Sequence, residues 1–384
     1  MNHRRENELI VCCSRREADA AELRTLLTEE INWEYVFATA QAHGVLPLLH
    51  KHLGGESVPS QVLSRLKRES VANSQNVLHL IAKQLRVVRL FKENGIPVAL
   101  FKGPLLAQMA YGEISLRQAG DIDVLINGRD FDHARTLLES LGYEMRPRLT
   151  NAQLASHLNN HCELQFMRDE WFTVVDLHWE LAPRSFVFNL RAADVMSRLQ
   201  QVSFAGTAVE TFGAEDLVLY LAMHGAKHLW RRLEWIASLA ESIRVDLNWD
   251  VLVQRAEHAH ATRMLALGLR LAQKFSNVDI PADVLAQIDA DGAIQRMSEQ
   301  VAAQLFNTFG AAESTETNLY NLRIMDRKRD ALVSALRAIF VPTFPDWQAL
   351  ALPAPLHSLY YAFRPLRLSK IYTSSLWRRM RRDA

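Results

Sequence analysis

Hydrophobic residues recur at steps of three and four positions along the first part of the chain, from about residue 20 to about residue 90. This spacing gathers them on one side of a helix and predicts a helical lead-in. Asn32 is expected to cap one of these helices. The last helix is expected to end at Asn94-Gly95, because glycine takes the left-handed conformation that ends many helices and Pro97 cannot continue one.

Beyond this point the pattern becomes that of a sheet with helices between its strands. Pro97 to Phe101 is a short continuous apolar run, which is typical of a buried strand. Hydrophobic residues at helical spacing follow Lys102-Gly103-Pro104 and predict a helix with proline at its first position. A second strand is expected over residues 121–126 and a second helix over residues 130–141.

Two later segments, residues 161–166 and 175–180, alternate between polar and apolar positions as half-buried strands do. Asp169-Glu170 between them suggests a hairpin turn, which would bring both polar rows to one side of a sheet. Helical spacing returns from residue 214, and Thr262 is expected to cap a later helix. Further helices are expected over residues 262–275, 294–306 and 329–340.

These patterns predict an α+β protein in which a small mixed sheet is flanked by helical regions. We expect an N-terminal helical region over residues 1–92, an α/β core over residues 93–205 and a C-terminal helical region over residues 206–384. The length of 384 residues agrees with about two to three domains, and 49% apolar residues supply a substantial core.

Charge and cysteine content exclude several classes of protein. With 44 Lys+Arg against 43 Asp+Glu the net charge is +1, so no global field attracts the protein to nucleic acid. The three cysteines (Cys12, Cys13 and Cys162) make neither a disulfide framework nor a zinc knuckle. We expect them to be small buried hydrophobic residues of a protein in a reducing compartment. No apolar run approaches the roughly 18 residues needed to cross a bilayer, so a cytoplasmic protein is expected.

Asp121-Ile122-Asp123 is the strongest chemical signal in the sequence. Aspartate is disfavoured in strands, yet these two aspartates project from one face of an otherwise apolar strand. Their charges repel each other unless a cation lies between them, and Mg²⁺ prefers such oxygen ligands. The alternative is that Asp121 caps a turn after Gly120 and that Asp123 pairs with an arginine such as Arg117.

The loop Lys102-Gly103-Pro104 is a candidate phosphate site, because it joins a buried strand to a helix N-terminus. Gly103 lets an oxyanion approach the backbone, and Lys102 adds a positive charge. Arg117 is a second candidate phosphate ligand. The alternatives are an ordinary strand-to-helix turn that needs a glycine, and a loop arginine that is solvated or ion-paired.

Asp176 lies among apolar neighbours on the second alternating strand. If that strand lies beside the strand of Asp121 and Asp123, three carboxylates converge and can hold two metal ions for an in-line nucleotidyl displacement. Asp176 would then be a metal ligand and a candidate general base. The alternative is a carboxylate on the solvated face of a hairpin, and His178 and Glu163 in the same polar rows are either surface groups or neighbours of the site.

At these positions the chain resembles a known family, the uncharacterised nucleotidyltransferases of the polymerase-β-type superfold. The likeness rests on Lys102-Gly103, Arg117, Asp121-Ile122-Asp123 and the later segment Val175 to Trp179. It extends over nearly the whole chain, to Trp33 and His43-Gly44 upstream and to His224, Lys227, His228, Trp230 and Leu233 downstream.

The resemblance implies a small nucleotidyltransferase core that moves an NMP from an NTP, first of all ATP, to a hydroxyl or phosphate acceptor. It implies three ligands for Mg²⁺ or Mn²⁺, namely Asp121, Asp123 and Asp176. It also implies contacts with the nucleotide phosphates, made by Lys102, Gly103, Arg117, Lys227 and His228. For His224 and His228, a shared metal and plain core or surface histidines are the alternatives.

The chain departs from the superfold at Pro104, where a second small residue is usual. This departure favours an alternative function, a non-catalytic relative that senses a nucleotide or binds a partner. A toxin-type enzyme that modifies tRNA or protein is a further alternative. The acceptor itself, whether a small molecule, a peptide, a protein or a tRNA, leaves no local signature.

The end of the chain is basic and has hydrophobic residues between its charges. It could contact nucleic acid, a membrane surface or an acidic partner, or be a solvated terminus. Its basic residues, which stand against Asp383 alone, are Arg364, Arg367, Lys370, Arg378, Arg379, Arg381 and Arg382.

Overall fold

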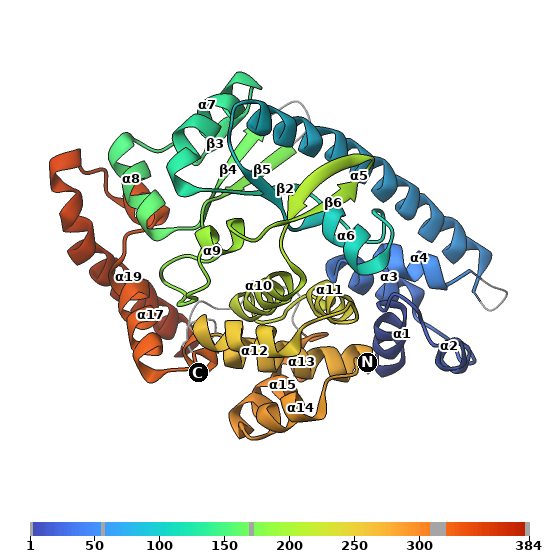
Figure 1. The fold of residues 1–384 in the computed structure, drawn as a ribbon. Coiled ribbons are helices and arrows are strands. Elements are labelled where there is room, and N and C mark those ends of the chain that lie inside the picture. Colours follow the sequence, from blue (N-terminus) through green and yellow to red (C-terminus); the bar gives the residue numbers. More distant parts are fainter. Residues whose placement is uncertain (1–2, 55–57, 169–172, 308–319, 381–384) are drawn as a thin grey trace.

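The computed structural model describes residues 3–54, 58–168, 173–307 and 320–380 (Figure 1). The chain begins with helices, as its hydrophobic spacing predicts, and Asn32 caps α3 by accepting a hydrogen bond from the backbone N–H of Tyr35. The long helix of this region ends at Asn94-Gly95, also as predicted. The helices are α1 (Arg4–Cys13), α2 (Ala20–Leu26), α3 (Trp33–Ala42), α4 (Leu46–His52) and α5 (Ser60–Glu93).

A mixed seven-stranded sheet follows, with the strand order β3-β4-β5-β2-β1-β7-β6. The pairs β2·β5 and β1·β7 are parallel, and the other neighbours are antiparallel. The strands are β1 (Val98–Leu100), β2 (Asp121–Ile126), β3 (Glu144–Arg146), β4 (Glu163–Arg168), β5 (Thr173–His178), β6 (Gln200–Phe204) and β7 (Thr207–Thr211). The helical segments between them are α6 (Gly103–Tyr111), η1 (Gly128–Asp130), α7 (Phe131–Ser140), α8 (Asn151–Asn160) and α9 (Ala192–Met196).

The described residues after the sheet are mainly helical, and their helices gather beside it (Figure 1). Its first helices are α10 (Ala214–Lys227), α11 (Leu233–Ile243), α12 (Trp249–His258), α13 (Thr262–Ser276), α14 (Ala282–Asp289) and α15 (Gly292–Gln304). The last are α17 (Lys328–Phe340), α18 (Phe344–Ala349), η3 (Ala354–Leu359) and α19 (Tyr360–Met380). Within the described ranges, no helix combines the length and the apolar character needed to cross a membrane.

The predicted α+β fold is confirmed, including the strand over residues 121–126. The predicted strand segments 161–166 and 175–180 agree with β4 and β5 over residues 163–166 and 175–178 only. Strands β3, β6 and β7 are not anticipated by the hydrophobic pattern, because each is short and contains at most two large hydrophobic residues. Strand β7 belongs to the sheet and lies beyond residue 205, while the three-part division of the chain stays a prediction. The predicted turn at Asp169-Glu170 lies outside the described residues.

The prediction that Thr262 caps its helix is wrong, because Ala261 holds the N-cap position and Thr262 is the first helical residue. Asp326, distant in sequence, provides the capping carboxylate and accepts hydrogen bonds from the backbone N–H groups of Thr262 and Arg263. Long-range capping of this kind leaves no local sequence signal.

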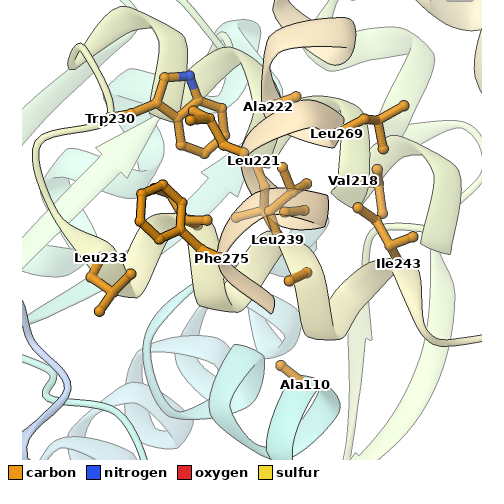
Figure 2. Packing of buried hydrophobic residues seen from close by; sticks show 14 of the residues in the cluster. Ala110, Val218, Leu221, Ala222, Trp230, Leu233, Leu239, Ile243, Leu269 and Phe275 are labelled. Atoms are coloured by element: carbon orange, nitrogen blue, oxygen red, sulfur yellow. The ribbon is translucent and has the colours of Figure 1, made fainter. Parts of the chain in front are cut away.

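Two hydrophobic clusters pack on opposite faces of the sheet. One contains Ile122 and Val124 with residues of α5 and α7, and the other contains Leu125 with residues of α6, α10, α11 and α13. Figure 2 shows the second cluster, in which Ala110 of α6 lies near the packed side chains of the C-terminal helices. The helices α10 to α15 therefore share one core with the sheet. The cysteines Cys12, Cys13 and Cys162 are buried and free, as expected.

Candidate active site

The three predicted carboxylates lie on one face of the sheet. Strands β2 and β5 are parallel neighbours, and Asp123 is paired in register with Asp176. Ile122 and Val124 point into the cluster under α5 and α7, so the alternate residues Asp121 and Asp123 project to the opposite face. The helices α10 and α11 pack on that face. The sheet topology thus brings together three side chains that are 55 residues apart at most in the sequence.

Asp123 is buried and already compensated by positive charge. Its Oδ1 accepts a hydrogen bond from Lys102 Nζ at 2.8 Å and lies 3.0 Å from His178 Nε2. Burial alone would raise the pKa of this carboxyl, but Lys102 and His178 outweigh burial and hold the pKa well below its ordinary value. In turn, burial disfavours the charged Lys102, and Asp123 more than offsets this and raises the pKa of the ammonium. The alternative pairing of Asp123 with Arg117 does not occur.

The pKa values of Asp176 and Asp121 are shifted in the opposite direction to that of Asp123. Burial and the charges of Asp123 and Asp121 raise the pKa of Asp176 to about 7. Burial and the charge of Asp123 also raise the pKa of Asp121. Asp176 Oδ1 is buried and has no hydrogen-bond partner. A buried carboxylate oxygen of this kind calls for a proton or a cation, so the residues present fit a divalent metal ion.

The loop after β1 has the geometry that the sequence suggests. Lys102 is the N-cap of α6, and Pro104 lies in the first turn of that helix. Gly103 has φ of +59°, a left-handed conformation that glycine adopts without strain. A Cβ at Gly103 would lie 3.9 Å from the backbone oxygen of Asp121, so the N-terminus of α6 is next to the start of β2.

Arg117 is held by the helical regions rather than by the aspartates. Its Nη2 lies 4.0 Å from Oε1 of the buried Glu234 on α11, and its Nη1 donates to the backbone oxygen of Gly103 at 3.4 Å. Arg232 Nη1 lies 3.3 Å from the same Glu234 oxygen. Burial nevertheless prevails and raises the pKa of Glu234. The two arginines therefore face one buried carboxyl.

The end of α10 brings Lys227 and His228 to the same side of the molecule. The charge of Lys227 is one of those that lower the pKa of Glu163 on β4, together with His178, against the opposing effect of burial. The rings of His224 and His228 are 4.7 Å apart and both pack against Trp235. Burial and the charge of Lys102 hold the pKa of His224 well below its ordinary value, which keeps it neutral.

His178 is the residue whose importance the sequence alone does not reveal. It is buried in β5, next to Asp176, and lies between Asp123 and Glu163. Burial lowers its pKa, but Glu163 and the hydrogen bond to Asp123 outweigh this and raise the pKa to about 9. Its place in the alternating polar row was the available signal, and the register of β4 with β5 gives that signal its meaning.

Comparison with known proteins identifies the family of the chain. Residues 29–277 match the model of the uncharacterised nucleotidyltransferase family. The chain belongs to this family. The match spans the N-terminal helices from α3, the sheet and the helices to α13. As a member of the family the chain has a nucleotidyltransferase core, and the resemblance seen in its residues is confirmed.

Solved structures and curated proteins add little to this assignment. The solved structure of the antibiotic-resistance factor ANT(2'')-Ia is similar at 13% identity with a TM-score of 0.28, covering 60% of this chain and 96% of that one. None of the curated proteins matches the chain.

Proposed function

We propose that the protein is a Mg²⁺- or Mn²⁺-dependent enzyme that transfers an NMP from an NTP, in the first instance ATP, to a hydroxyl or phosphate acceptor. The observation that carries this proposal is the buried, unpartnered oxygen of Asp176 in register with Asp123. In a chain of the nucleotidyltransferase family, carboxylates placed in this way are suited to hold metal ions. Asp121, Asp123 and Asp176 would be the ligands.

Asp121, Asp123 and Asp176 would hold two metal ions, which would supply charge neutralisation of the triphosphate and a lowered pKa of the attacking hydroxyl. The acceptor oxygen forms a bond to the α-phosphorus, and the bond from the α-phosphorus to the bridging oxygen breaks to release pyrophosphate. Asp176, in register with Asp123, is the group to which we assign removal of the proton from the acceptor hydroxyl.

The remaining residues of the site are proposed to bind the phosphates. Lys102 and the backbone of Gly103 lie at the N-terminus of α6, where an anion is stabilised by free N–H groups and by the helix dipole. Arg117 contacts Gly103 and is oriented by Glu234. Lys227 and His228 would approach the phosphates from the end of α10. When a nucleotide binds, the Lys102 ammonium would exchange Asp123 for a phosphate oxygen.

The test combines nucleotide binding with group transfer. Wild-type protein is expected to bind ATP in the presence of Mg²⁺ in calorimetry, and Asp121→Asn, Asp123→Asn and Asp176→Asn are expected to lose both the Mg²⁺-dependent part of binding and transfer of label from α-labelled ATP. The matched control is Asp132→Asn, since Asp132 is an exposed aspartate of α7 on the other side of the sheet. Unchanged Mg²⁺-dependent binding in the three site variants would refute the assignment.

A second candidate function has a specific observation in its favour. Lys102 and His178 already compensate Asp123, which is how a site without metal would neutralise its carboxylate. A nucleotide-sensing relative without catalysis would therefore bind ATP and transfer nothing. Incubation with labelled ATP, CTP, GTP and UTP, Mg²⁺ and a cell lysate distinguishes the two, because label on a defined small molecule, protein or tRNA requires catalysis and also identifies the acceptor.

A further inference from the structure

Behind His178, on the side away from Asp123, three different metal-ligating side chains converge. One ligand atom each of Cys162, Glu163 and His178 lies within 4.8 Å of the other two. In the described part of the chain, no other group of three or more His, Cys, Asp or Glu residues meets this criterion, and the three aspartates of the proposed active site do not. The cluster is thus distinct in position and in chemistry from the aspartates.

His178 contributes an unsatisfied atom to this cluster. The side chain is 2% exposed, its Nε2 bonds to Asp123, and its Nδ1 has no hydrogen-bond partner although Glu163 Oε2 lies 3.1 Å away. The ring is also fixed by an edge contact with Phe101. Nδ1 thus faces the ligand atoms of Cys162 and Glu163 without being committed to an aligned hydrogen bond.

We propose that Cys162, Glu163 and His178 Nδ1 form a binding site for a single Zn²⁺ ion, separate from the aspartate site. Sulfur, nitrogen and oxygen donors suit this borderline cation, whereas Mg²⁺ takes oxygen ligands. Ligand bonds of about 2.0–2.3 Å in a tetrahedron place donor atoms about 3.6 Å apart, so a small inward movement from the present spacing completes the site. Three protein ligands leave a fourth position open.

The surroundings provide both an entry path and a charge balance. Glu163 pairs in register with His178 and its side chain is 40% exposed, so the ion reaches the site from the Glu163 side. A thiolate and a carboxylate neutralise the two charges of Zn²⁺, and the imidazole binds as the neutral ring. The two protons displaced, one from the Cys162 thiol and one from His178 Nδ1, go to solvent.

Zinc at this position would act on the proposed active site through His178. With Nδ1 bound to the ion, Nε2 keeps its hydrogen and donates it to Asp123, which is the usual pairing of a metal-bound histidine with a carboxylate. The occupied site thereby fixes the tautomer and the orientation of His178. Binding of Zn²⁺ itself is independent of the proposed nucleotidyl transfer and is measured without nucleotide.

The first experiment measures zinc binding by the full chain after removal of metal with a chelator. We expect one equivalent of Zn²⁺ in competition with a chromophoric chelator, and a thiolate-to-metal charge-transfer band when Co²⁺ is used instead. Cys162→Ser is expected to abolish the band and to weaken Zn²⁺ binding on the order of 100-fold or more. Loss of a direct metal ligand should reduce affinity at least as much as loss of a residue that hydrogen-bonds to a ligand. Glu163→Gln, at a partly exposed position, is expected to weaken binding while folding normally.

Two control variants distinguish zinc held by this cluster from zinc held by another cysteine or by the aspartates. Cys12→Ser replaces a buried cysteine whose Sγ lies 3.9 Å from the backbone oxygen of Asp19, and it is expected to leave zinc binding unchanged. Asp176→Asn, in the aspartate site, is also expected to retain Zn²⁺. Absence of zinc binding in the wild-type protein, loss of zinc in Asp176→Asn, or full binding in both Cys162→Ser and Glu163→Gln overturns the proposal, whether or not the protein transfers nucleotides.

Discussion

Asp123 and Asp176 occupy paired positions on neighbouring strands, yet their environments push their pKa values in opposite directions. Asp123 contacts two positively charged groups, whereas one oxygen of Asp176 has no partner. Residues of one chemical type therefore take different roles according to their neighbours. Asp123 is a permanent anion, and Asp176 changes its protonation state near neutral pH.

Asp176→Asn is expected to stabilise the protein in buffer that contains a chelator. The pKa of Asp176 is about 7 in the folded protein and 3.8 as the ordinary value. Between these values the unfolded chain binds fewer protons than the folded one, so the stability of the wild type falls as pH rises. The gain from asparagine is therefore smallest near pH 4 and largest above pH 7, at most about 4 kcal/mol. Thermal unfolding of both proteins across this pH range measures the difference in stability. The control Asp132→Asn is expected to show a difference that does not change with pH.

Lys102 and Asp123 are expected to be strongly coupled in stability. Lys102→Met leaves Asp123 buried with His178 as its counter-charge, which costs about 3 kcal/mol. Asp123→Asn added to Lys102→Met removes the buried charge that has lost its Lys102 partner, so the double variant should be more stable than Lys102→Met alone. Chemical denaturation of the wild type, both single variants and the double variant gives the coupling energy. Additive effects would contradict the close ion pair.

At the scale of elements, the sequence predicts the parts of the site that lie on strands or helices with regularly spaced hydrophobic residues. The strand of Asp121 and Asp123 and the strand of Asp176 are visible as apolar segments interrupted by carboxylates, and the turn at Gly103 as the end of a buried run. Their adjacency is not visible, because β5 joins β2 across some fifty intervening residues. Strands β6 and β7 escape prediction for a different reason, since their pairing with the edge of the sheet outweighs a weak local pattern.

The same limit applies to the residues that hold Arg117. Glu234 gives no sign of its role in the sequence, because its partners come from distant elements. The backbone N–H of Glu234 donates to the His43 oxygen, and that of Leu233 donates to His43 Nδ1. The turn between α3 and α4 therefore fixes the start of α11, and α11 places the carboxylate beside Arg117.

Gly44→Ala tests this connection between elements. Gly44 has φ of +73°, and a Cβ there would lie 2.0 Å from Glu234 Oε2. Gly95 is the matched control, since its φ is +74° and a Cβ would meet nothing within 4 Å. Gly95→Ala should cost about 1 kcal/mol from the backbone alone. Gly44→Ala should lower the stability by more than this and should also weaken ATP binding, because Glu234 and Arg117 must shift. Equal effects of the two substitutions in thermal unfolding and calorimetry would argue against the connection.

At the scale of the whole molecule, the near-neutral net charge conceals charges that are compensated locally. The basic C-terminal segment is the clearest case. Two of its arginines, Arg364 and Arg367, bind the fully buried Asp346 of α18 at 2.6 Å each. Asp346 also accepts hydrogen bonds from the backbone and the hydroxyl of Thr343. These two positive charges therefore join α18 to α19 and are not available to an outside partner.

Asp346→Ala is expected to loosen α17, α18 and α19 without affecting the sheet. The substitution leaves Arg364 and Arg367 partly buried without their shared anion, a loss of about 3 kcal/mol. These helices lie beyond residue 277, where the family match ends, whereas the proposed active site lies within the matched residues. Hydrogen exchange should accelerate in residues 328–371 and stay unchanged in β2 and β5, while Asp289→Asn, at an exposed ion pair of α14, should change neither. Faster exchange throughout the sheet would instead mean that the C-terminal helices and the nucleotidyltransferase core unfold as one unit, because local opening reports where cooperative units end.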